Sequence, residues 1–317
     1  NDGWTKHSGN IYKKAIALPV TGYTDIITEN SSLLANQVFV NGKMMIEARW
    51  PNISNSDDLM NRVDFAPVPK DGWINGEGTT LQDPSIPDIP GGWTGGTIWI
   101  IGWYVPGTSN ITACSAGQIK FPLVRGDEHH DSYYLTGRMG ALDTEKEWFY
   151  DGTMLYLWAP DSGIPANVEV KMRNYAFDLS DKSYITISNI SVFAATITTN
   201  TNSTNIILDR LKLQYVSHFV TLPLVPEEYL KLYWLTNPVT HSHFHDSGVR
   251  LMGTNSVIQN SIVQYSAGHG IVLGGAGCVA ENNLVHDISY SGTYACGIQP
   301  TRCDAPQAIT HNTIYRT

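Results

Sequence analysis

The sequence predicts an all-β protein in which a solenoid of stacked β coils follows a β-rich module. A motif of the form apolar-x-polar-Asn-x-apolar recurs three times near the C-terminus, at residues 257–262, 279–284 and 309–314. Pieces of the form Gly-apolar-x-apolar follow the same rhythm at residues 248–251 and 270–273. The first half of the chain instead alternates short apolar stretches with turns that contain Gly and Pro. A recurring short unit is typical of stacked repeats, and irregular short strands are typical of a separate β module.

The spacing of the motif sets the length of one coil. Asn260 and Asn282 are 22 residues apart (282 − 260), and Asn312 follows 30 residues later (312 − 282). Weaker copies upstream carry Asp209 and Ser188 in the Asn place, 21 residues apart (209 − 188). We expect the three asparagines to stack in register, each side-chain amide bonding the one above and the one below. The alternative, an antiparallel sandwich with chance matches, does not explain why the motif and the Gly-containing strand recur together.

The first part of the chain, residues 1–178, is predicted to be a β-sandwich-like module. Asn41 and Gly42 form the centre of a hairpin turn, because these two residues tolerate the positive φ angles that a tight primed turn needs. The apolar stretches at residues 97–101, 154–158 and 168–172 read as strands.

The solenoid is predicted to cover residues 179–317, with excursions from the coil at about 220–247 and 286–304. Residues 226–234 begin with Pro-Glu-Glu, a favourable helix start, so a short helix is expected there. No capping element follows the last motif, and an uncapped coil exposes unpaired backbone. We therefore expect further coils beyond the end of this chain.

Residues 180–317 resemble the right-handed parallel β-helix proteins of the pectate-lyase-like superfamily. Residues 37–43, 47–52 and 142–151 resemble a subgroup in which a β-rich module precedes the helix or is inserted into it. The subgroup is widespread among secreted bacterial proteins and includes glycoside hydrolases of the xylosidase, xylanase and fucosidase kind. The resemblance implies a right-handed parallel β-helix with an additional β-sandwich-like module. It says little about the substrate, since one fold hosts many chemistries.

Composition excludes several classes of function. The net charge is −9, whereas nucleic-acid binding needs a clustered basic surface. No apolar run approaches the ~20 residues of a membrane span. A nucleophile elbow, a phosphate-binding glycine loop and the zinc spacings Cys-x-x-Cys and His-Glu-x-x-His are all missing from the sequence. Together with the resemblance, this favours an exported protein, either secreted or periplasmic.

A histidine cluster follows the first excursion. If the chain is extended there, His241, His243 and His245 share one face, with Asp246 on the other. His241 and His245 would then lie ~13 Å apart, too far for one metal ion. Only neighbouring pairs could share an ion, so a metal site is the least favoured of three interpretations. The others are catalytic or substrate-binding groups and solvated loop residues.

Stacking predicts which residues meet. Tyr265 and Asp287 each lie five positions after a motif asparagine, so they should occupy one column, with His286 stacked on Gln264 in the next column. Asp246 precedes Gly248 as residue 268 precedes Gly270, so Asp246 should lie directly below residue 268, one coil earlier. These side chains should gather at one corner of neighbouring coils. The alternative for Asp287 is a turn-capping aspartate.

The predicted catalytic pair is Asp246 and Asp287, with His243 and His286 positioning them. Because the two carboxylates are expected two coils apart, their separation falls near the ~6.5–9.5 Å of an inverting glycosidase. The residues predicted to bind substrate are Trp234, Tyr265, Tyr290, Asp304 and His245. The carboxylates of the first module are predicted to be turn and surface residues, namely Glu47, Asp143, Glu147 and Asp151.

The function predicted from these residues is a glycoside hydrolase acting on a plant or algal polysaccharide without a cofactor. One carboxylic acid would protonate the leaving oxygen, and the other carboxylate would activate water. A polysaccharide lyase on the same fold is the first alternative. A lyase needs a base and a cation, either Ca²⁺ or a basic side chain, and basic residues near the corner are few: Arg250, Arg302 and Arg316. A non-catalytic adhesin or structural β-helix is the second alternative.

Overall fold

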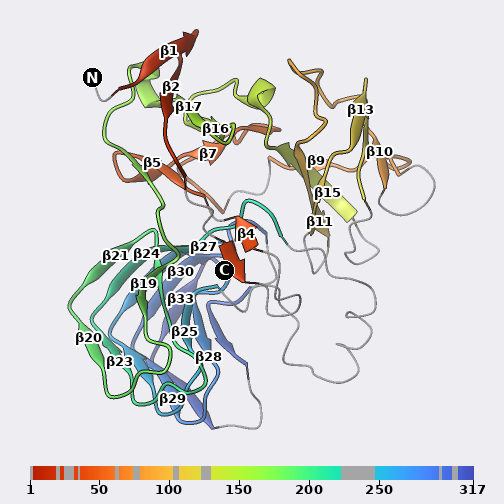
Figure 1. Ribbon diagram of the computed structural model, residues 1–317. Helices are drawn as coiled ribbons and strands as arrows, with labels where there is room; N and C mark the ends of the chain where they lie inside the picture. Colours follow the sequence, from red (N-terminus) through yellow and green to blue (C-terminus); the bar gives the residue numbers. More distant parts are fainter. Residues whose placement is uncertain are drawn as a thin grey trace. The chain divides into compact units, whose positions relative to one another are not determined.

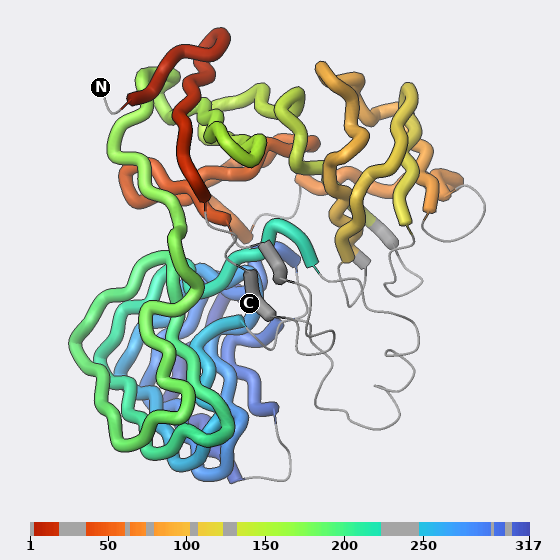
Figure 2. Tube along the Cα trace, viewed as in Figure 1, coloured from red at the N-terminus to blue at the C-terminus, as the bar shows by residue number. Residues whose placement is uncertain are grey.

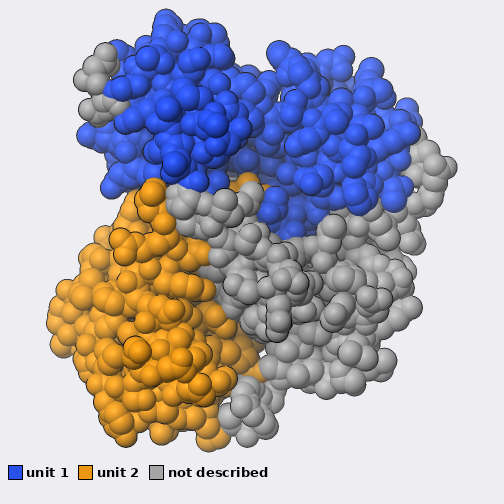
Figure 3. All heavy atoms as spheres, in the orientation of Figure 1, with its two compact units in different colours: residues 1–19, 36–170, 221–225 blue, residues 20–35, 171–220, 226–317 orange. Residues whose placement is uncertain are grey.

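The computed structural model describes residues 3–18, 22–24, 32–34, 36–60, 64–73, 79–102, 107–122, 130–222, 247–292, 295–301 and 306–317. The described chain is all-β, with two single-turn 3-10 helices, η1 (Met139–Ala141) and η2 (Pro160–Ser162). It divides into two compact units, coloured separately in Figure 3. Unit 1 comprises residues 1–19, 36–170 and 221–225, and unit 2 comprises residues 20–35, 171–220 and 226–317. The domain boundaries expected from the sequence stay a prediction.

The described residues of unit 2 from Lys171 onward form a parallel β-helix of five coils with three faces (Figures 1 and 2). The first face consists of β19 (Tyr175–Asp178), β22 (Thr196–Thr198), β25 (Val249–Leu251), β28 (Ile271–Leu273) and β31 (Ile298–Pro300). The second consists of β20 (Thr186–Ser188), β23 (Ile207–Asp209), β26 (Val257–Gln259), β29 (Cys278–Glu281) and β32 (Gln307–Thr310). The third consists of β21 (Ser191–Phe193), β24 (Lys212–Ser217), β27 (Ile262–Ser266), β30 (Leu284–Ile288) and β33 (Thr313–Tyr315). The predicted parallel β-helix is confirmed.

The core of unit 2 is built from columns of equivalent residues. Successive side chains of a strand point to opposite sides, so the central residue of each short strand points into the coil. On the second face the four inner rungs that are buried are Ile187, Leu208, Ile258 and Ala280. Because each rung contacts mainly the rungs next to it, the core forms one continuous cluster along the stack.

The corner between the second and third faces has the same length in every coil. Two residues connect the strands each time, and the first of them has a left-handed backbone with φ between 51° and 57°: Asn189, Arg210, Asn260, Asn282 and His311. L-residues other than Gly disfavour this conformation, and Asn tolerates it best. In the first two copies of the motif, the asparagine therefore occupies a left-handed corner, whereas His311 does so in the third copy.

The predicted amide ladder exists over three residues. Asn260 Nδ2 donates to Asp209 Oδ1 at 2.8 Å, and Asn282 Nδ2 donates to Asn260 Oδ1 at 2.8 Å. The register nevertheless differs from the expected one, because Asp209 pairs with Gln259. Arg210 therefore stands in the Asn place of its coil.

The expectation that Asn312 stacks on Asn282 is wrong. The last repeat is 29 residues long, since Glu281 pairs with Thr310, so Asn312 lies next to Asn283. Asn283 is 2% exposed and starts a second, inner ladder. Its Nδ2 donates to Asn312 Oδ1 at 3.0 Å, and its Oδ1 accepts from the backbone N–H of Ser261 at 3.0 Å. A buried amide must satisfy its hydrogen bonds, and this need fixes the register.

The corner between the third and first faces is the irregular one. A second column of left-handed residues, with φ between 53° and 60°, lies near the end of each third-face strand: Ala194, Tyr215, Tyr265, Asp287 and Arg316. The chain needs only residues 267–270 to pass from β27 to β28. It uses residues 218–248 between β24 and β25, and residues 289–297 between β30 and β31. Both long departures from the coil therefore leave from this corner.

Unit 1 is built from mostly antiparallel sheets. One sheet has the strand order β1 (Thr5–Ser8), β2 (Ile11–Ala15), β17 (Met154–Trp158), β16 (Glu147–Tyr150), β7 (Ile46–Glu47). A second sheet has the order β12 (Gly107–Asn110), β11 (Thr97–Gly102), β15 (His130–Thr136), β8 (Arg49–Trp50). Its fifth strand is β9 (Ala66–Pro67), which also pairs with β15. Its three-stranded sheets run β10 (Thr80–Gln82), β14 (Gln118–Lys120), β13 (Ala113–Ser115), and β18 (Val168–Val170), β5 (Val38–Val40), β6 (Lys43–Met44). The strands expected at 97–101 and 154–158 are confirmed. The hairpin turn is confirmed too, with φ of 52° at Asn41 and 73° at Gly42. The sandwich-like arrangement stays a prediction.

The expected surface position of Glu147 is wrong. Glu147 is 2% exposed, because β16 lies inside its sheet between β17 and β7. Its Oε1 accepts from the backbone N–H of Arg49 at 3.3 Å, and its Oε2 accepts from that of Asp143 at 3.4 Å. Burial raises the pKa of Glu147 to about 8, and burial raises the pKa of Glu47 to the same level. Asp143 and Asp151 are exposed, as expected.

Candidate active site at a corner of the β-helix

Asp287 lies in the left-handed column at the irregular corner, on β30. Its Oδ1 accepts from Arg316 Nε at 2.7 Å, and its Oδ2 lies 2.5 Å from His286 Nδ1. Arg316 occupies the same column one coil later, since His286 pairs with Tyr315. Both carboxylate oxygens are thus engaged, and the side chain is 9% exposed. With Nδ1 donating to the carboxylate, a neutral His286 carries its lone pair on Nε2.

The rings around His286 form a stacked row along the third face. The predicted pairing of His286 with Gln264 is confirmed. The imidazole stacks on Tyr315 with centroids 4.8 Å apart and meets Tyr265 edge-on at 6.2 Å. Tyr265 stacks in turn on Tyr215 at 4.8 Å. One face of Tyr265 is therefore covered, and a sugar would reach its edge and hydroxyl more readily than a free ring face.

Tyr290 joins the two long departures from the coil. It is 7% exposed and belongs to residues 289–297. Its hydroxyl lies 2.8 Å from Nδ1 of His218, the first residue of the other departure, and 3.2 Å from the carbonyl oxygen of Ser217. The contact spans two coils, from β30 back to β24. As a sugar platform, Tyr290 would have to present a ring that is buried here, so its observed role is to tie the two segments together.

Two basic groups near Tyr290 were not singled out by the sequence. Burial, with a smaller contribution from the charge of Lys171, lowers the pKa of His218 to about 3. Lys171 is 2% exposed, and burial lowers its pKa to about 7. Near neutral pH a large share of this amine is therefore uncharged. Nothing in the local sequence marks either residue, because their burial depends on the coils packed around them.

The chain returns from the long excursion at the same corner. The backbone N–H of Gly248 donates to Ser217 Oγ at 2.7 Å, and that of His269 donates to Ser247 Oγ at 2.8 Å. Gly248 has φ of 74°, and an added Cβ would lie 2.5 Å from the carbonyl oxygen of His269, so only glycine fits. Asp246 immediately precedes this anchored segment but lies outside the described residues. The other predicted residues outside them are His243, His245, Trp234 and Asp304.

Neither a metal cluster nor a membrane-spanning helix is found in the part of the chain that the structure describes. No group of three or more His, Cys, Asp or Glu residues is arranged there to hold an ion. No helix there has the length and apolarity needed to cross a bilayer. The calcium ion that a lyase could use stays a proposal.

Comparison with known proteins gives a few remote structural likenesses. No family model matches the chain, and no curated protein matches it. A solved structure described as a glycoside hydrolase is 11% identical, with a TM-score of 0.37, covering 98% of this chain and 81% of that one. The structure of XylC in complex with xylose is 15% identical, with a TM-score of 0.47, covering 99% of this chain and 46% of that one. The tailspike protein of Pseudomonas phage LKA1 is 9% identical, with a TM-score of 0.16, covering 80% of this chain and 47% of that one. These likenesses say nothing about what the chain binds or does.

Proposed function

We propose that this protein is an exported glycoside hydrolase that cleaves a plant or algal polysaccharide at the irregular corner of the β-helix. The observation that carries the proposal is the hydrogen bond between His218 and Tyr290. It brings together the only two long departures found among the described third-to-first connections, and Tyr290 follows Asp287 by three residues (290 − 287). Loops held on a rigid scaffold are where binding and catalytic groups concentrate.

The roles proposed for the carboxylates follow from their surroundings. Asp287 has both oxygens engaged by Arg316 and His286, so it suits the accepting role better than the donating one. It would orient His286 or an attacking water. Asp246 would then be the general acid that protonates the leaving oxygen, with His243 near it. An expected spacing of two coils favours attack by water and inversion at the anomeric carbon.

The sugar contacts are proposed to come from polar groups as well as rings. Tyr265 would contribute its hydroxyl and ring edge, since Tyr215 covers one of its faces. Trp234 would supply a ring platform, and Asp304 and His245 would bind hydroxyl groups. The proposal needs no cofactor, and its partner is a polysaccharide or oligosaccharide.

The test is hydrolysis of a polysaccharide panel by the wild type and the variants Asp287→Asn and Asp246→Asn. Loss of a group that moves a proton lowers kcat by about 10²–10⁴-fold. Glu281→Gln is the matched control, because Glu281 lies in the same coil on the second face and is exposed. Wild-type kinetics for Asp287→Asn would remove Asp287 from the mechanism. NMR of the first-formed sugar reports the anomer, and retention would contradict the pairing of Asp246 with Asp287.

A polysaccharide lyase is the second candidate, and Lys171 favours it. A lyase needs a base that removes a proton next to a uronate carboxylate. Lys171 has a pKa of about 7, but it is 2% exposed and would have to be uncovered by substrate binding to act as that base. Product absorbance of an unsaturated uronate separates the two reactions. The lyase would be established if the wild type produced this absorbance without hydrolysing any glycan and the Lys171→Met variant did not produce it. No turnover of any glycan would leave the non-catalytic β-helix.

A further inference from the structure

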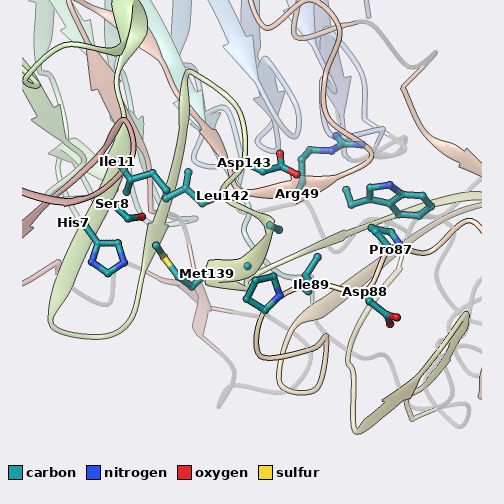
Figure 4. Close-up of a pocket in the computed structure, with 14 residues that line it drawn as sticks. His7, Ser8, Ile11, Arg49, Pro87, Asp88, Ile89, Met139, Leu142 and Asp143 are labelled. Carbon is teal, nitrogen blue, oxygen red and sulfur yellow. The ribbon is translucent and has the colours of Figure 1, made fainter.

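Unit 1 contains a cleft that the reaction proposed for the β-helix corner does not use. Its volume is about 540 Å³, and it is lined by residues of β1, β2, β8, the segment before Gly91, and η1 (Figure 4). This volume falls within the roughly 300–1,000 Å³ of small-molecule sites. All of its lining residues belong to unit 1.

The floor of the cleft is apolar and firmly packed. Ile11 and Leu142 are buried, and Met139 is half-buried beside them. Trp50 is half-buried and forms part of the wall, where its ring lies 6.0 Å from that of Tyr133 in the core. The cleft therefore offers an indole together with aliphatic surface, as ligand sites commonly do.

Arg49 fixes the position of Trp50. Arg49 is 5% exposed, its Nε donates to the carbonyl oxygen of Pro51 at 2.8 Å, and its Nη2 donates to that of Asp64 at 3.0 Å. Its guanidinium carbon lies 4.0 Å from the ring centroid of Tyr134. These contacts hold the backbone on both sides of Trp50, so the wall is formed before a ligand arrives. A preformed wall lowers the entropy cost of binding.

The polar groups on the rim are carboxylates and an imidazole. Asp143 is exposed, and its Oδ1 accepts from Asn52 Nδ2 at 2.8 Å, which orients the group and leaves Oδ2 for a ligand. Asp88 is exposed, and the structure gives its carboxylate no hydrogen bond within the described residues. Figure 4 shows His7 at one end of the cleft and Asp88 at the other.

This combination selects a class of ligand. Carboxylates accept hydrogen bonds from hydroxyl groups, and an indole packs against the axial C–H face of a pyranose ring. The same carboxylates repel an anionic sugar, and Arg49, the arginine among the residues that line the cleft, already donates to backbone carbonyls. We propose that the cleft binds a short neutral oligosaccharide, with a sugar ring on Trp50 and hydroxyl groups on Asp88 and Asp143. It is a glycan-binding site that shares no residue with the corner.

Isothermal titration calorimetry of the full chain tests the proposal, with xylotetraose, cellotetraose and mannotetraose as probes and tetragalacturonate as the anionic comparison. We expect at least one neutral tetrasaccharide to bind. Trp50→Ala should weaken that binding by about tenfold or more, since ring anchors dominate such contacts. Asp88→Ala should weaken it by about fivefold, the value of one hydrogen bond. Asp88 is exposed, so its variant is expected to fold normally.

Matched controls separate binding from stability. Trp73→Ala removes another half-buried tryptophan of unit 1, which meets Phe121 edge-on and does not line the cleft. Asp71→Ala removes another exposed carboxylate of the same unit. Both controls should bind like the wild type, and thermal melts of all four variants show which of them are folded.

Three results would overturn the proposal: no binding of any neutral tetrasaccharide, binding that Trp50→Ala and Asp88→Ala leave unchanged, or tighter binding of tetragalacturonate. Failure here is distinguishable from failure of the proposed hydrolase. If the protein hydrolyses a glycan but Trp50→Ala and Asp88→Ala leave binding unchanged, the cleft proposal is rejected and the hydrolase proposal stands. Binding that depends on Trp50 and Asp88 in a protein that hydrolyses nothing rejects the enzyme and keeps the cleft.

Discussion

Replacing Glu147 with Gln should destabilise the protein at acid pH and stabilise it at alkaline pH. Burial raises the pKa of Glu147 from 4.5 to about 8 in the folded protein. The folded state therefore prefers the protonated acid, whose stabilising contribution is complete below pH 4.5 and is lost as pH rises through about 8. At ~1.36 kcal/mol per pH unit, the free energy of unfolding falls by about 5 kcal/mol across that window.

The amide of Gln cannot titrate, so the variant escapes this loss. Its oxygen can accept from the backbone N–H of Arg49, but its NH₂ group then faces the backbone N–H of Asp143. One poorly satisfied buried group costs about 1–3 kcal/mol. At pH 5 the wild type has already lost about 0.7 kcal/mol, so we expect Glu147→Gln to be less stable there by about 0.5–2 kcal/mol and more stable at pH 9 by about 2–4 kcal/mol.

Urea unfolding at pH values from 5 to 9, followed by tryptophan fluorescence, measures both effects. Glu145→Gln is the matched control, because Glu145 is exposed two residues earlier and should follow the wild-type curve. Glu47 also titrates near pH 8, so the readout is the difference between variant and wild type rather than either slope alone. Parallel stability curves for wild type and Glu147→Gln would refute the burial argument.

Three further variants test the coil geometry. Asn260→Ala loses two ladder hydrogen bonds and places Ala at φ of 54°, so chemical denaturation should show the free energy of unfolding lowered by about 2–3 kcal/mol. Asn260→Gly should lower it by only about half as much, because Gly adopts the left-handed backbone freely. Equal losses would reject the left-handed corner as the reason for Asn. Asn283→Ala orphans the buried N–H of Ser261 and should cost about 3 kcal/mol by the same assay, more than the exposed Asn282→Ala. Tyr290→Phe removes the hydroxyl that joins His218 and Ser217, so calorimetry should show a melting temperature lower by a few degrees, and an unchanged value would mean that the contact does not stabilise the corner.

The sequence predicted the coils because their period is local information. Each strand and corner repeats within the low twenties of residues, and Asn is the letter that a left-handed corner favours. The two adjacent asparagines Asn282 and Asn283 also explain the wrong prediction of register, in which Asn312 was expected to stack on Asn282. One asparagine turns the corner and its neighbour enters the core, and only the packing of Asn283 against Ser261 and Asn312 distinguishes them.

The candidate site was only partly accessible to sequence reasoning. The column of Tyr265 and Asp287 follows from counting along the repeat. Lys171 and His218 could not be found that way, because they are 47 residues apart in the sequence (218 − 171) and their shifted pKa values come from burial by other coils. Glu147 was misjudged for the same reason, since a carboxylate among charged neighbours reads as exposed until its sheet is known.

The contrast between two corners leads to a prediction about where the β-helix tolerates extra residues. Each corner between the second and third faces has two residues. A longer corner would separate the side chains that form the amide ladders from their partners in the neighbouring coils. The third-to-first corner passes from four residues between β27 and β28 to nine between β30 and β31 without breaking the sheets on either side. A Gly-Ser insertion between Ser291 and Gly292 should therefore cost about 1–2 kcal/mol, which combines loop entropy with the hydrogen bond from the backbone N–H of Gly292 to Ser289.

The same Gly-Ser insertion between Asn282 and Asn283 should cost several kcal/mol. It breaks the bonds from Asn283 to Ser261 and Asn312 and shifts the following strand out of register. Comparison of the two variants by thermal melting measures the difference within a single coil. Equal destabilisation would mean that the corners are equivalent, and the reasons for placing the active site at the irregular one would fail with them.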